Sequence, residues 1–235
     1  MSNLILVRGN AGQGKSTVAL NLAFALKHFG YDVLLVDADT KNPRLGHYLG
    51  MPLVQNTVQA VLSGRLELSK SIYQLPNGVK ALFSSINEDA AKHPSTFLDA
   101  VKQYSTLVIV DCSNDAQWDS VNGEHLIVVE PDFPSGLSAL KIKKSTNARY
   151  CVVNRARAPQ LPTQNIEEIT HTRCLARINE DLLIREASLK GHSVLDYEPN
   201  CASSEAFKQL AANLMNLEYS PSAKKEPLLA RLGIL

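Results

Sequence analysis

The sequence has almost no net charge, few cysteines and no long apolar run. Its 235 residues carry 24 Lys and Arg against 23 Asp and Glu, a formal net charge of +1. No global field therefore favours nucleic acid or an anionic membrane. No apolar run approaches the length that crosses a bilayer, and the N-terminus lacks the basic segment and cleavage site of a secretion signal. We expect neither a membrane span nor export.

The cysteines are too scattered to form a structural framework. The four of them are Cys112, Cys151, Cys174 and Cys201, and no two form a C-x-x-C pair. This spacing indicates neither a zinc site nor a set of disulfides. We expect reduced thiols, as in a cytoplasmic protein.

The strongest pattern is a glycine-rich stretch that follows an apolar run. Gly9 is followed by Gly14, Lys15 and Ser16 at the spacing G-x-x-x-x-G-K-[ST]. Leu4–Val7 before it is typical of a buried strand, and the apolar positions after it recur at helical spacing. In such a loop the backbone N–H groups and the positive end of the helix dipole hold phosphate. The predicted phosphate-binding residues are Gly9, Asn10, Ala11, Gly12, Gln13, Gly14, Lys15, Ser16 and Thr17.

Acidic residues follow two predicted strands. The apolar run 33–36 ends in Asp37-Ala38-Asp39, and the run 107–110 ends in Asp111. Parallel strands present their carboxyl ends at the edge of the sheet where ligands bind. We predict that Ser16, Asp37 and Asp111 hold Mg²⁺, and that Lys15, Asp37 and Asp39 serve catalysis, Asp39 by orienting the attacking water. The alternative for Asp37 and Asp39 is a solvated acidic loop end.

Strand and helix patterns alternate along the whole chain. Further strands are expected at 79–83, 126–129 and 151–153, and helices at 57–62, 94–101, 138–144 and 204–215, with short elements after residue 166. The first strand, helix and second strand form a βαβ unit. The predicted fold class is α/β: one P-loop NTPase domain over residues 1–217, with a central, mostly parallel twisted sheet and helices on both faces.

These motifs resemble the MinD/ParA family of deviant Walker A P-loop ATPases, and the similarity is closest to archaeal-type MinD. It extends from residue 4 to about residue 215. It is carried by the P-loop, Asp37-Ala38-Asp39, Leu45-Gly46, Leu49-Gly50, Val61-Leu62-Ser63-Gly64, Ile72-Tyr73, Val152-Val153-Asn154-Arg155, Ile178-Asn179-Glu180-Asp181 and Arg185.

The resemblance implies a nucleotide switch. ATP or ADP would bind with Mg²⁺, and ATP would favour a homodimer that a regulatory partner protein acts upon. The residue matching Asn154 reads adenine in the family, with Arg155 beside it, and the loop matching Ile178, Asn179 and Asp181 packs against the base. Cell division, plasmid partitioning and cargo positioning are the functions of such proteins.

Two departures from the family pattern bear on hydrolysis. Asn10 and Ala11 stand where the family has a lysine and a glycine, and that lysine reaches the phosphates of the partner subunit. A neutral amide cannot offset phosphate charge as an ammonium does. After Asp111 the family has Pro-Ala-Gly, whereas this chain has Cys112-Ser113-Asn114-Asp115. The carboxysome-positioning McdA branch, the second-closest resemblance, can also lack the lysine.

A lysine from elsewhere could replace the missing one in trans. The candidates are Lys141, Lys143 and Lys144. The alternative is that these three lysines form a solvated helix face.

The composition changes after residue 217. Residues 218–235 form a linker and then a basic amphipathic tail, in which four leucines share one helical face. Those residues are Leu228, Leu229, Leu232 and Leu235, with Lys224, Lys225 and Arg231 around them. Such a tail can lie on a membrane, and two copies in a dimer would bind more stably than one. We therefore expect a cytoplasmic protein that attaches to the inner face of the cell membrane; the alternative is a helix docked on its own domain.

Three other functions remain open from the sequence. Non-specific DNA could replace the membrane as the surface, because the second half carries Arg149, Arg155, Arg157, Arg173 and Arg177. A metabolic P-loop enzyme would need an acceptor site, for which no motif is visible. A nucleotide sensor without hydrolysis would fit the change at Asn10.

Overall fold

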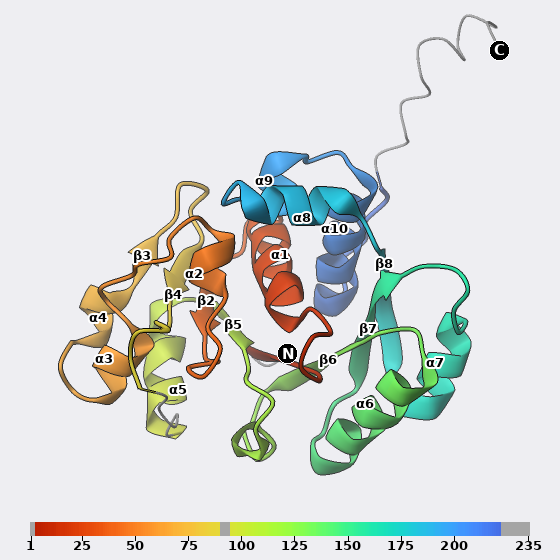
Figure 1. Ribbon diagram of the computed structural model, residues 1–235, viewed down its shortest axis with the longest axis horizontal. Coiled ribbons are helices and arrows are strands. Elements are labelled where there is room, and N and C mark those ends of the chain that lie inside the picture. Colours follow the sequence, from red (N-terminus) through yellow and green to blue (C-terminus); the bar gives the residue numbers. More distant parts are fainter. Residues whose placement is uncertain (1–2, 90–94, 222–235) are drawn as a thin grey trace, which may run out of the picture.

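Strands and helices alternate throughout residues 3–89 and 95–221, the part of the chain that this computed structural model describes (Figure 1). The strands are β1 (Leu4–Arg8), β2 (Val33–Asp37), β3 (Tyr73–Gln74), β4 (Lys80–Leu82), β5 (Leu107–Asp111), β6 (Glu124–Val129), β7 (Tyr150–Ala156) and β8 (Arg173–Asn179). The α-helices are α1 (Lys15–His28), α2 (Leu45–Tyr48), α3 (Val58–Leu62), α4 (Leu68–Ser71), α5 (Ser95–Val101), α6 (Phe133–Ser145), α7 (Thr163–Thr170), α8 (Leu182–Leu189), α9 (Val194–Tyr197) and α10 (Ala202–Met215). Two 3₁₀ turns, η1 (Lys102–Tyr104) and η2 (Ala116–Trp118), follow α5 and β5.

The strands form one sheet in the order β3-β4-β2-β5-β1-β6-β7-β8. All neighbours are parallel except β3 and β4. β1 lies between β5 and β6, so the chain reverses its direction of travel across the sheet at β1. Ligands of open α/β sheets bind at the carboxyl ends of the strands at such a point. The fold confirms the predicted α/β class and brings the loops after β1, β2 and β5 together.

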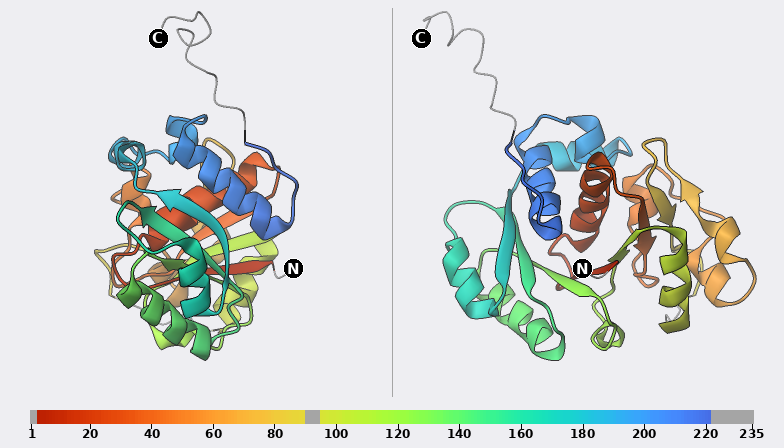
Figure 2. Two further views of the ribbon diagram at one scale, coloured as in Figure 1. Left: turned by 90° about the vertical axis from the view of Figure 1, so that its right-hand side faces the viewer. Right: turned by 180° about the vertical axis from the view of Figure 1, so that it is seen from behind.

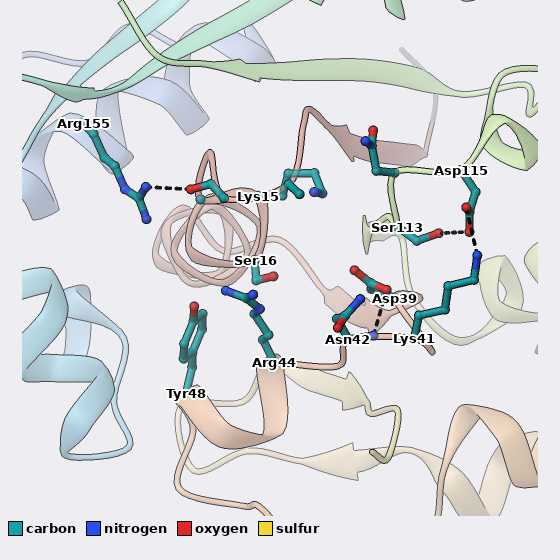
Figure 3. Close-up of a pocket in the computed structure, with 14 residues that line it drawn as sticks. Lys15, Ser16, Asp39, Lys41, Asn42, Arg44, Tyr48, Ser113, Asp115 and Arg155 are labelled. Carbon is teal, nitrogen blue, oxygen red and sulfur yellow. Dashed lines mark hydrogen bonds and ion pairs between the residues drawn. The ribbon is translucent and has the colours of Figure 1, made fainter. Parts of the chain in front are cut away.

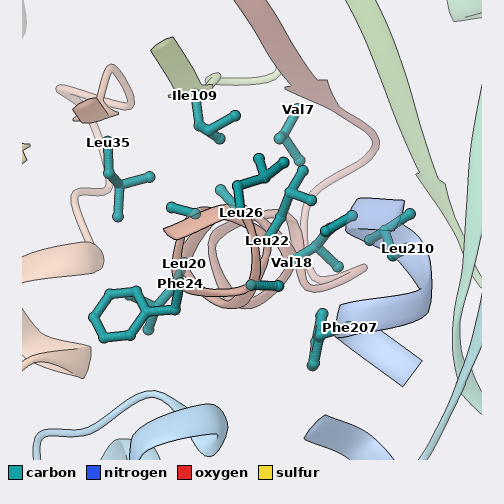
Figure 4. Packing of buried hydrophobic residues seen from close by; sticks show 14 of the residues in the cluster. Val7, Val18, Leu20, Leu22, Phe24, Leu26, Leu35, Ile109, Phe207 and Leu210 are labelled. Carbon is teal, nitrogen blue, oxygen red and sulfur yellow. The ribbon is translucent and has the colours of Figure 1, made fainter. Parts of the chain in front are cut away.

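Helices cover both faces of the sheet (Figure 2). α1 packs against α10 and against β1, β2 and β5, whereas α6 and α7 pack together beside β6 and β8. Val18, Leu22 and Leu26 of α1 are fully buried and pack in one cluster with Phe207 and Leu210 of α10 (Figure 4). Burying a large apolar side chain contributes about 1.5–3 kcal/mol. The helix that follows the glycine-rich loop is therefore held rigidly by the core.

The structure differs from the sequence-based expectations at several places, among them β7, which spans Tyr150–Ala156 where 151–153 was expected, and β6, which begins at Glu124 rather than 126. β8 and the short edge strand β3 were not predicted as strands. α6 begins at Phe133, five residues before the predicted start at Ser138, because Asp132 caps it by accepting a hydrogen bond from Ser135 N at 2.7 Å. Asp and Pro at a helix start are ordinary capping signals that the apolar periodicity does not reveal.

The predicted basic tail, 224–235, lies outside the described residues. The chain leading to it is anchored on the domain: the Tyr219 ring packs edge-on against Phe29, and its hydroxyl donates to Glu205 Oε2 at 2.6 Å. In the described part of the chain, no helix combines the length and the apolar character that a bilayer crossing demands.

Candidate functional site

The glycine-rich loop between β1 and α1 adopts backbone angles that only glycine takes readily. Gly9 has φ 147° and Gly14 has φ 89°. A Cβ added at Gly9 would lie 2.7 Å from the carbonyl oxygen of Val128 on β6, and one at Gly14 would collide with the Asn154 amide. Glycine at these positions lets the loop curl tightly, so that its N–H groups converge at the start of α1. The loop is thus a cradle of the kind that binds phosphate.

Hydrogen bonds within the loop fix its shape. Gln13 Oε1 accepts from Asn10 N at 2.8 Å, and Lys15 Nζ donates to Asn10 O at 3.2 Å. Lys15 is 9% exposed, and this hydrogen bond holds its ammonium against the loop, where it could donate to the outer oxygens of a bound phosphate. The Asn10 side chain instead lines other cavities, which Lys15 and Ser16 do not line.

An open cavity of about 310 Å³ lies over the loop (Figure 3). Of the predicted residues, Ala11, Gly12, Gly14, Lys15, Ser16, Asp39 and Arg155 line it. Ser113, Asn114 and Asp115, from the segment that departs from the family pattern after Asp111, also line it. Residues that the sequence did not single out complete its wall: Lys41, Asn42, Arg44 and Tyr48. These four follow β2, where no motif marks a side chain and only the fold brings it to the site.

Two carboxylates lie buried behind Ser16. Asp37 accepts hydrogen bonds from the backbone N–H groups of Arg44 and Leu45, both at 3.1 Å, through Oδ2 alone. Asp37 Oδ1 and both carboxyl oxygens of Asp111 are buried without a hydrogen-bond partner. Burial, followed by the charge of Asp111, raises the pKa of Asp37. Burial also raises the pKa of Asp111 to about 7, against the opposing effects of the Ser16 hydroxyl and of Lys15.

This arrangement fits a hard divalent cation bound together with phosphate. Buried polar oxygens without partners are rare and call for an unseen ligand. In the described residues, no group of three or more His, Cys, Asp or Glu side chains could hold a metal alone. Mg²⁺ is usually held by one or two carboxylates plus substrate phosphates and water. Ser16, Asp37 and Asp111 would hold the cation here, which would neutralise phosphate charge when bound.

Replacing Asp111 with asparagine tests how much the unpartnered, buried carboxylate oxygens lower the stability of the ligand-free protein. In the absence of nucleotide and cation, Asp111→Asn should stabilise the protein by roughly 2 kcal/mol, or about 5 °C in melting temperature, because it removes a buried charge that Ser16 and Lys15 offset only in part. Thermal unfolding monitored by circular dichroism measures this. The same variant should lose most of the stabilisation that Mg²⁺ adds to bound ADP. A melting temperature below that of the parent without ligands would contradict the assignment.

A salt bridge joins the two loops that flank the cavity. Lys41 Nζ lies 3.1 Å from Asp115 Oδ1, and Ser113 Oγ donates to Asp115 Oδ2 at 3.0 Å (Figure 3). The Lys41 side chain is 59% exposed, and exposed pairs contribute only about 0–1 kcal/mol. The bridge can therefore open at little cost when a ligand enters.

A second cavity of about 440 Å³ adjoins the loop on the side of β7 and α8. The predicted residues Thr17, Asn154, Arg155, Asn179 and Asp181 line it, together with Tyr48 and Arg185. Tyr48 and Arg155 also line the first cavity. Ile178, predicted to contact the base, is fully buried and does not line the cavity, because its side chain packs in the same core cluster as Leu175 and Phe207.

Two side chains at the end of β7, which line this second cavity, form hydrogen bonds with the glycine-rich loop. Asn154 Nδ2 donates to Gln13 O at 2.8 Å, and Arg155 Nη1 donates to Gly12 O at 2.6 Å and to Glu130 Oε1 at 3.0 Å. Arg155 has φ 52°, a left-handed conformation unusual for a side chain of this size. Such strain concentrates at ligand sites. The two cavities thus share one wall, as a phosphate site and a neighbouring base site would.

Known proteins share this architecture. An ATP-binding protein of Methanocaldococcus jannaschii is 26% identical over 240 residues, which cover 95% of this chain and 91% of that protein. The septum site-determining protein MinD of Pyrococcus horikoshii, solved in complex with Mg-ADP, superposes with a TM-score of 0.83 at 26% identity, covering 91% of this chain and 96% of that one. The cell division ATPase MinD of Pyrococcus furiosus gives the same TM-score and identity, covering 92% and 99%.

A family model extends over most of the sequence. The model of the CobQ/CobB/MinD/ParA nucleotide-binding domain matches residues 4–194, from the first residue of β1 to the first residue of α9. This range includes the glycine-rich loop, the acids of β2 and β5 and the second cavity. The protein therefore belongs to the CobQ/CobB/MinD/ParA family of nucleotide-binding domains.

Proposed function

We propose that this protein is a Mg²⁺-dependent ATPase that works as a dimerisation switch and positions cellular machinery or cargo on a surface. The observation that carries the ATPase proposal is the set of unpartnered, buried carboxylate oxygens of Asp37 and Asp111 beside the glycine-rich loop. Structural acids would be paired or hydrogen-bonded. The unpartnered oxygens of Asp37 and Asp111 could bind a cation beside the phosphate-binding loop, as a Mg-nucleotide site requires.

The residues around the first cavity have different roles in phosphoryl transfer. Lys15 and the loop N–H groups bind phosphate oxygens and offset their charge. Asp39 lines the cavity, where its Oδ1 accepts from Asn42 N at 3.1 Å, and its other oxygen is available to orient a water molecule. Bound Mg²⁺ would supply charge neutralisation at the transferred phosphate. In-line attack by the water that Asp39 orients would yield ADP and phosphate.

Turnover should be slow without a partner. Asn10 stands at the position of the lysine that crosses to the other subunit in related ATPases, and its amide carries no charge. A regulatory partner protein that reorders the loop over 112–119 would raise the rate, because that loop adjoins the phosphate cradle through Ser113 and Asp115.

An exposed apolar pair supports the homodimer. Phe133 and Leu137 of α6 are 58% and 45% exposed and lie one helical turn apart. Pro134, in the same helix turn, lines a cavity with Asn10, Ala11, Gly12 and Gln13, so the outer face of the glycine-rich loop adjoins this pair. A second copy seated face to face would cover the apolar pair and approach the nucleotide.

Light scattering tests the switch. Asp39→Ala should bind ATP without turning it over, so ATP and Mg²⁺ should convert the variant from monomer to dimer, while ADP should leave it monomeric. Adding Phe133→Ser should weaken the dimer without weakening nucleotide binding by more than about twofold. A strictly monomeric Asp39→Ala protein at saturating ATP would remove dimerisation from the proposal.

The proposed surface is the membrane at the cytoplasmic side of the cell. The support is the pattern of leucines, lysines and arginine in the predicted tail, 224–235. With ATP, the protein should co-sediment with anionic liposomes, and deletion of 224–235 should abolish this. Salt-dependent binding to non-specific DNA in the ATP state, unaffected by the deletion, would instead indicate a partitioning ATPase that uses DNA as its surface.

A further inference from the structure

The cavity over the glycine-rich loop is lined by more bases than acids, and one base has no partner. Among the described residues, two acids and four bases line it. The acids are Asp39 and Asp115, and the bases are Lys15, Lys41, Arg44 and Arg155. Arg44 differs from the other bases, because its side chain forms no ion pair or hydrogen bond with any of residues 3–89 and 95–221. It is also exposed, so a ligand in the cavity can reach it.

The other three bases are already engaged. Lys41 and Arg155 are each held in a salt bridge, and Lys15 Nζ donates to Asn10 O at 3.2 Å. An anion that enters the cavity can bind the guanidinium of Arg44 without first breaking a contact within the protein. Arg44 is therefore the base of this cavity that is most available to a phosphate group.

The backbone of Arg44 is fixed beside the predicted cation site, while its side chain is free. Its N–H group donates to Asp37 Oδ2 at 3.1 Å, and the residues on either side of it are buried. Figure 3 shows the side chain pointing from this anchor toward Ser16 at the start of α1. Burial raises the pKa of Asp111 to about 7, and Arg44 is among the positive charges that oppose this rise. The guanidinium thus lies on the side of the cavity where Ser16 and the two acids would hold the cation.

From this placement, and resting on the ATPase proposed above, we infer that Arg44 donates to the terminal phosphate of ATP bound in the same chain. It supplies part of the positive charge that the neutral Asn10 amide does not offer. A guanidinium can bind two phosphate oxygens at once and stays protonated, so it stabilises the charge that spreads over the terminal phosphate during transfer.

Arg44 itself gains and loses no proton in this reaction. The oxygen of water bonds to the terminal phosphorus while the bond from that phosphorus to the bridging oxygen breaks, which yields ADP, phosphate and one proton. ADP has no terminal phosphate, so the contact is made with ATP alone. Arg44 would therefore both favour ATP over ADP and accelerate hydrolysis.

Calorimetric titration of Arg44→Gln with Mg-ADP and with the Mg²⁺ complex of AMP-PNP, an ATP analogue that is not hydrolysed, tests this contact. The variant should bind Mg-ADP within about twofold of the parent and the analogue about tenfold more weakly, which corresponds to the loss of one charge-assisted hydrogen bond. Its rate of phosphate release from ATP should fall by roughly 1,000-fold, since an arginine at a transferred phosphate contributes about 10³–10⁵-fold.

Two further variants complete the comparison. Arg44→Lys keeps the charge without the planar fork, so it should recover part of the analogue affinity and of the rate. Arg65→Gln removes a guanidinium that is 63% exposed and lines none of the cavities described above, and it should match the parent in every measurement. In a Phe133→Ser background, where the dimer is weakened, Arg44→Gln should cause the same loss, because the contact lies within one chain.

The contrary results separate this contact from the nucleotide site itself. If the parent binds both nucleotides and Arg44→Gln keeps the same ratio of the two affinities, the role of Arg44 is overturned and the site stands. A parent that binds no nucleotide overturns the ATPase proposal and this inference together. A loss confined to the dimeric background would place the contact between subunits and overturn the assignment to one chain. Loss of the ATP preference in Lys41→Gln but not in Arg44→Gln would assign the role to Lys41. Should Arg44→Gln fail to fold by circular dichroism, Arg44→Lys decides, since it must weaken binding of the analogue more than binding of ADP.

Discussion

Lys15→Ala is expected to lower the affinity for Mg-ATP and Mg-ADP by roughly 100-fold or more, since hydrogen bonds from a charged donor contribute about 1.5–3 kcal/mol each and this ammonium can serve two phosphates. The side chain is 9% exposed and already held against the loop by Asn10 O, so little side-chain entropy remains to be lost on binding. Isothermal titration calorimetry measures the effect.

The control for Lys15→Ala is an exposed lysine outside the cavities. Lys70→Ala removes the same charge from α4, where the Lys70 side chain is 66% exposed, and should bind nucleotide as the parent does. Without ligand, Lys15→Ala should melt at a lower temperature than the parent, because it removes the hydrogen bond to Asn10 O and the ammonium that opposes the raised pKa of Asp111, so nucleotide binding is measured below that temperature. Nucleotide affinity that survives Lys15→Ala within a factor of about three would mean that the glycine-rich loop is not the phosphate site.

Asp39→Ala is expected to lower the steady-state rate of ATP hydrolysis by roughly 100-fold or more while Mg-ATP still binds. A positioned group that orients or accepts a proton from the attacking water contributes about 10²–10⁴-fold. Asp39 suits this role because it lines the cavity, whereas Asp37 and Asp111 are buried behind it. Phosphate release under saturating ATP measures the rate.

Asp99→Ala is the matched control for Asp39→Ala, since Asp99 is an exposed acid of α5 that lines none of the cavities described above. Its rate should equal that of the parent. A rate for Asp39→Ala within twofold of the parent rate would mean that another group orients the attacking water. If the parent protein hydrolysed no ATP, the protein would instead be a nucleotide sensor without hydrolysis.

The local signals in the sequence were sufficient for the fold class and for the phosphate cradle. The glycine-rich loop requires backbone angles that only glycine adopts readily. The glycines of the G-x-x-x-x-G-K-S pattern therefore predict the conformation that Gly9 and Gly14 have in the structure. Buried parallel strands are continuous apolar runs, and β1, β2 and β5 are such runs. These elements were predicted within one residue of their observed ends.

Other features could not be read from local patterns. β8 lies at the edge of the sheet, contains Arg173 and Arg177 and has neither a continuous apolar run nor a regular alternation, so its identity as a strand depends on pairing with β7. The cavity residues Lys41, Arg44 and Tyr48 belong to no motif, because the path of the chain after β2 places them. The burial of Arg8 and its salt bridge with Asp119 likewise depend on the fold, because η2 and the residues after it are packed against the end of β1.

The most direct test of the account is calorimetric titration of the parent protein with ADP, with and without Mg²⁺. The central claim is that the loop before α1 binds phosphate and that Ser16, Asp37 and Asp111 hold the cation against it. The account predicts one site per chain, with an affinity at least about tenfold higher when Mg²⁺ is present, and loss of that increase in Asp111→Asn. Equal affinity with and without Mg²⁺, or no heat of binding with any nucleotide, would contradict it.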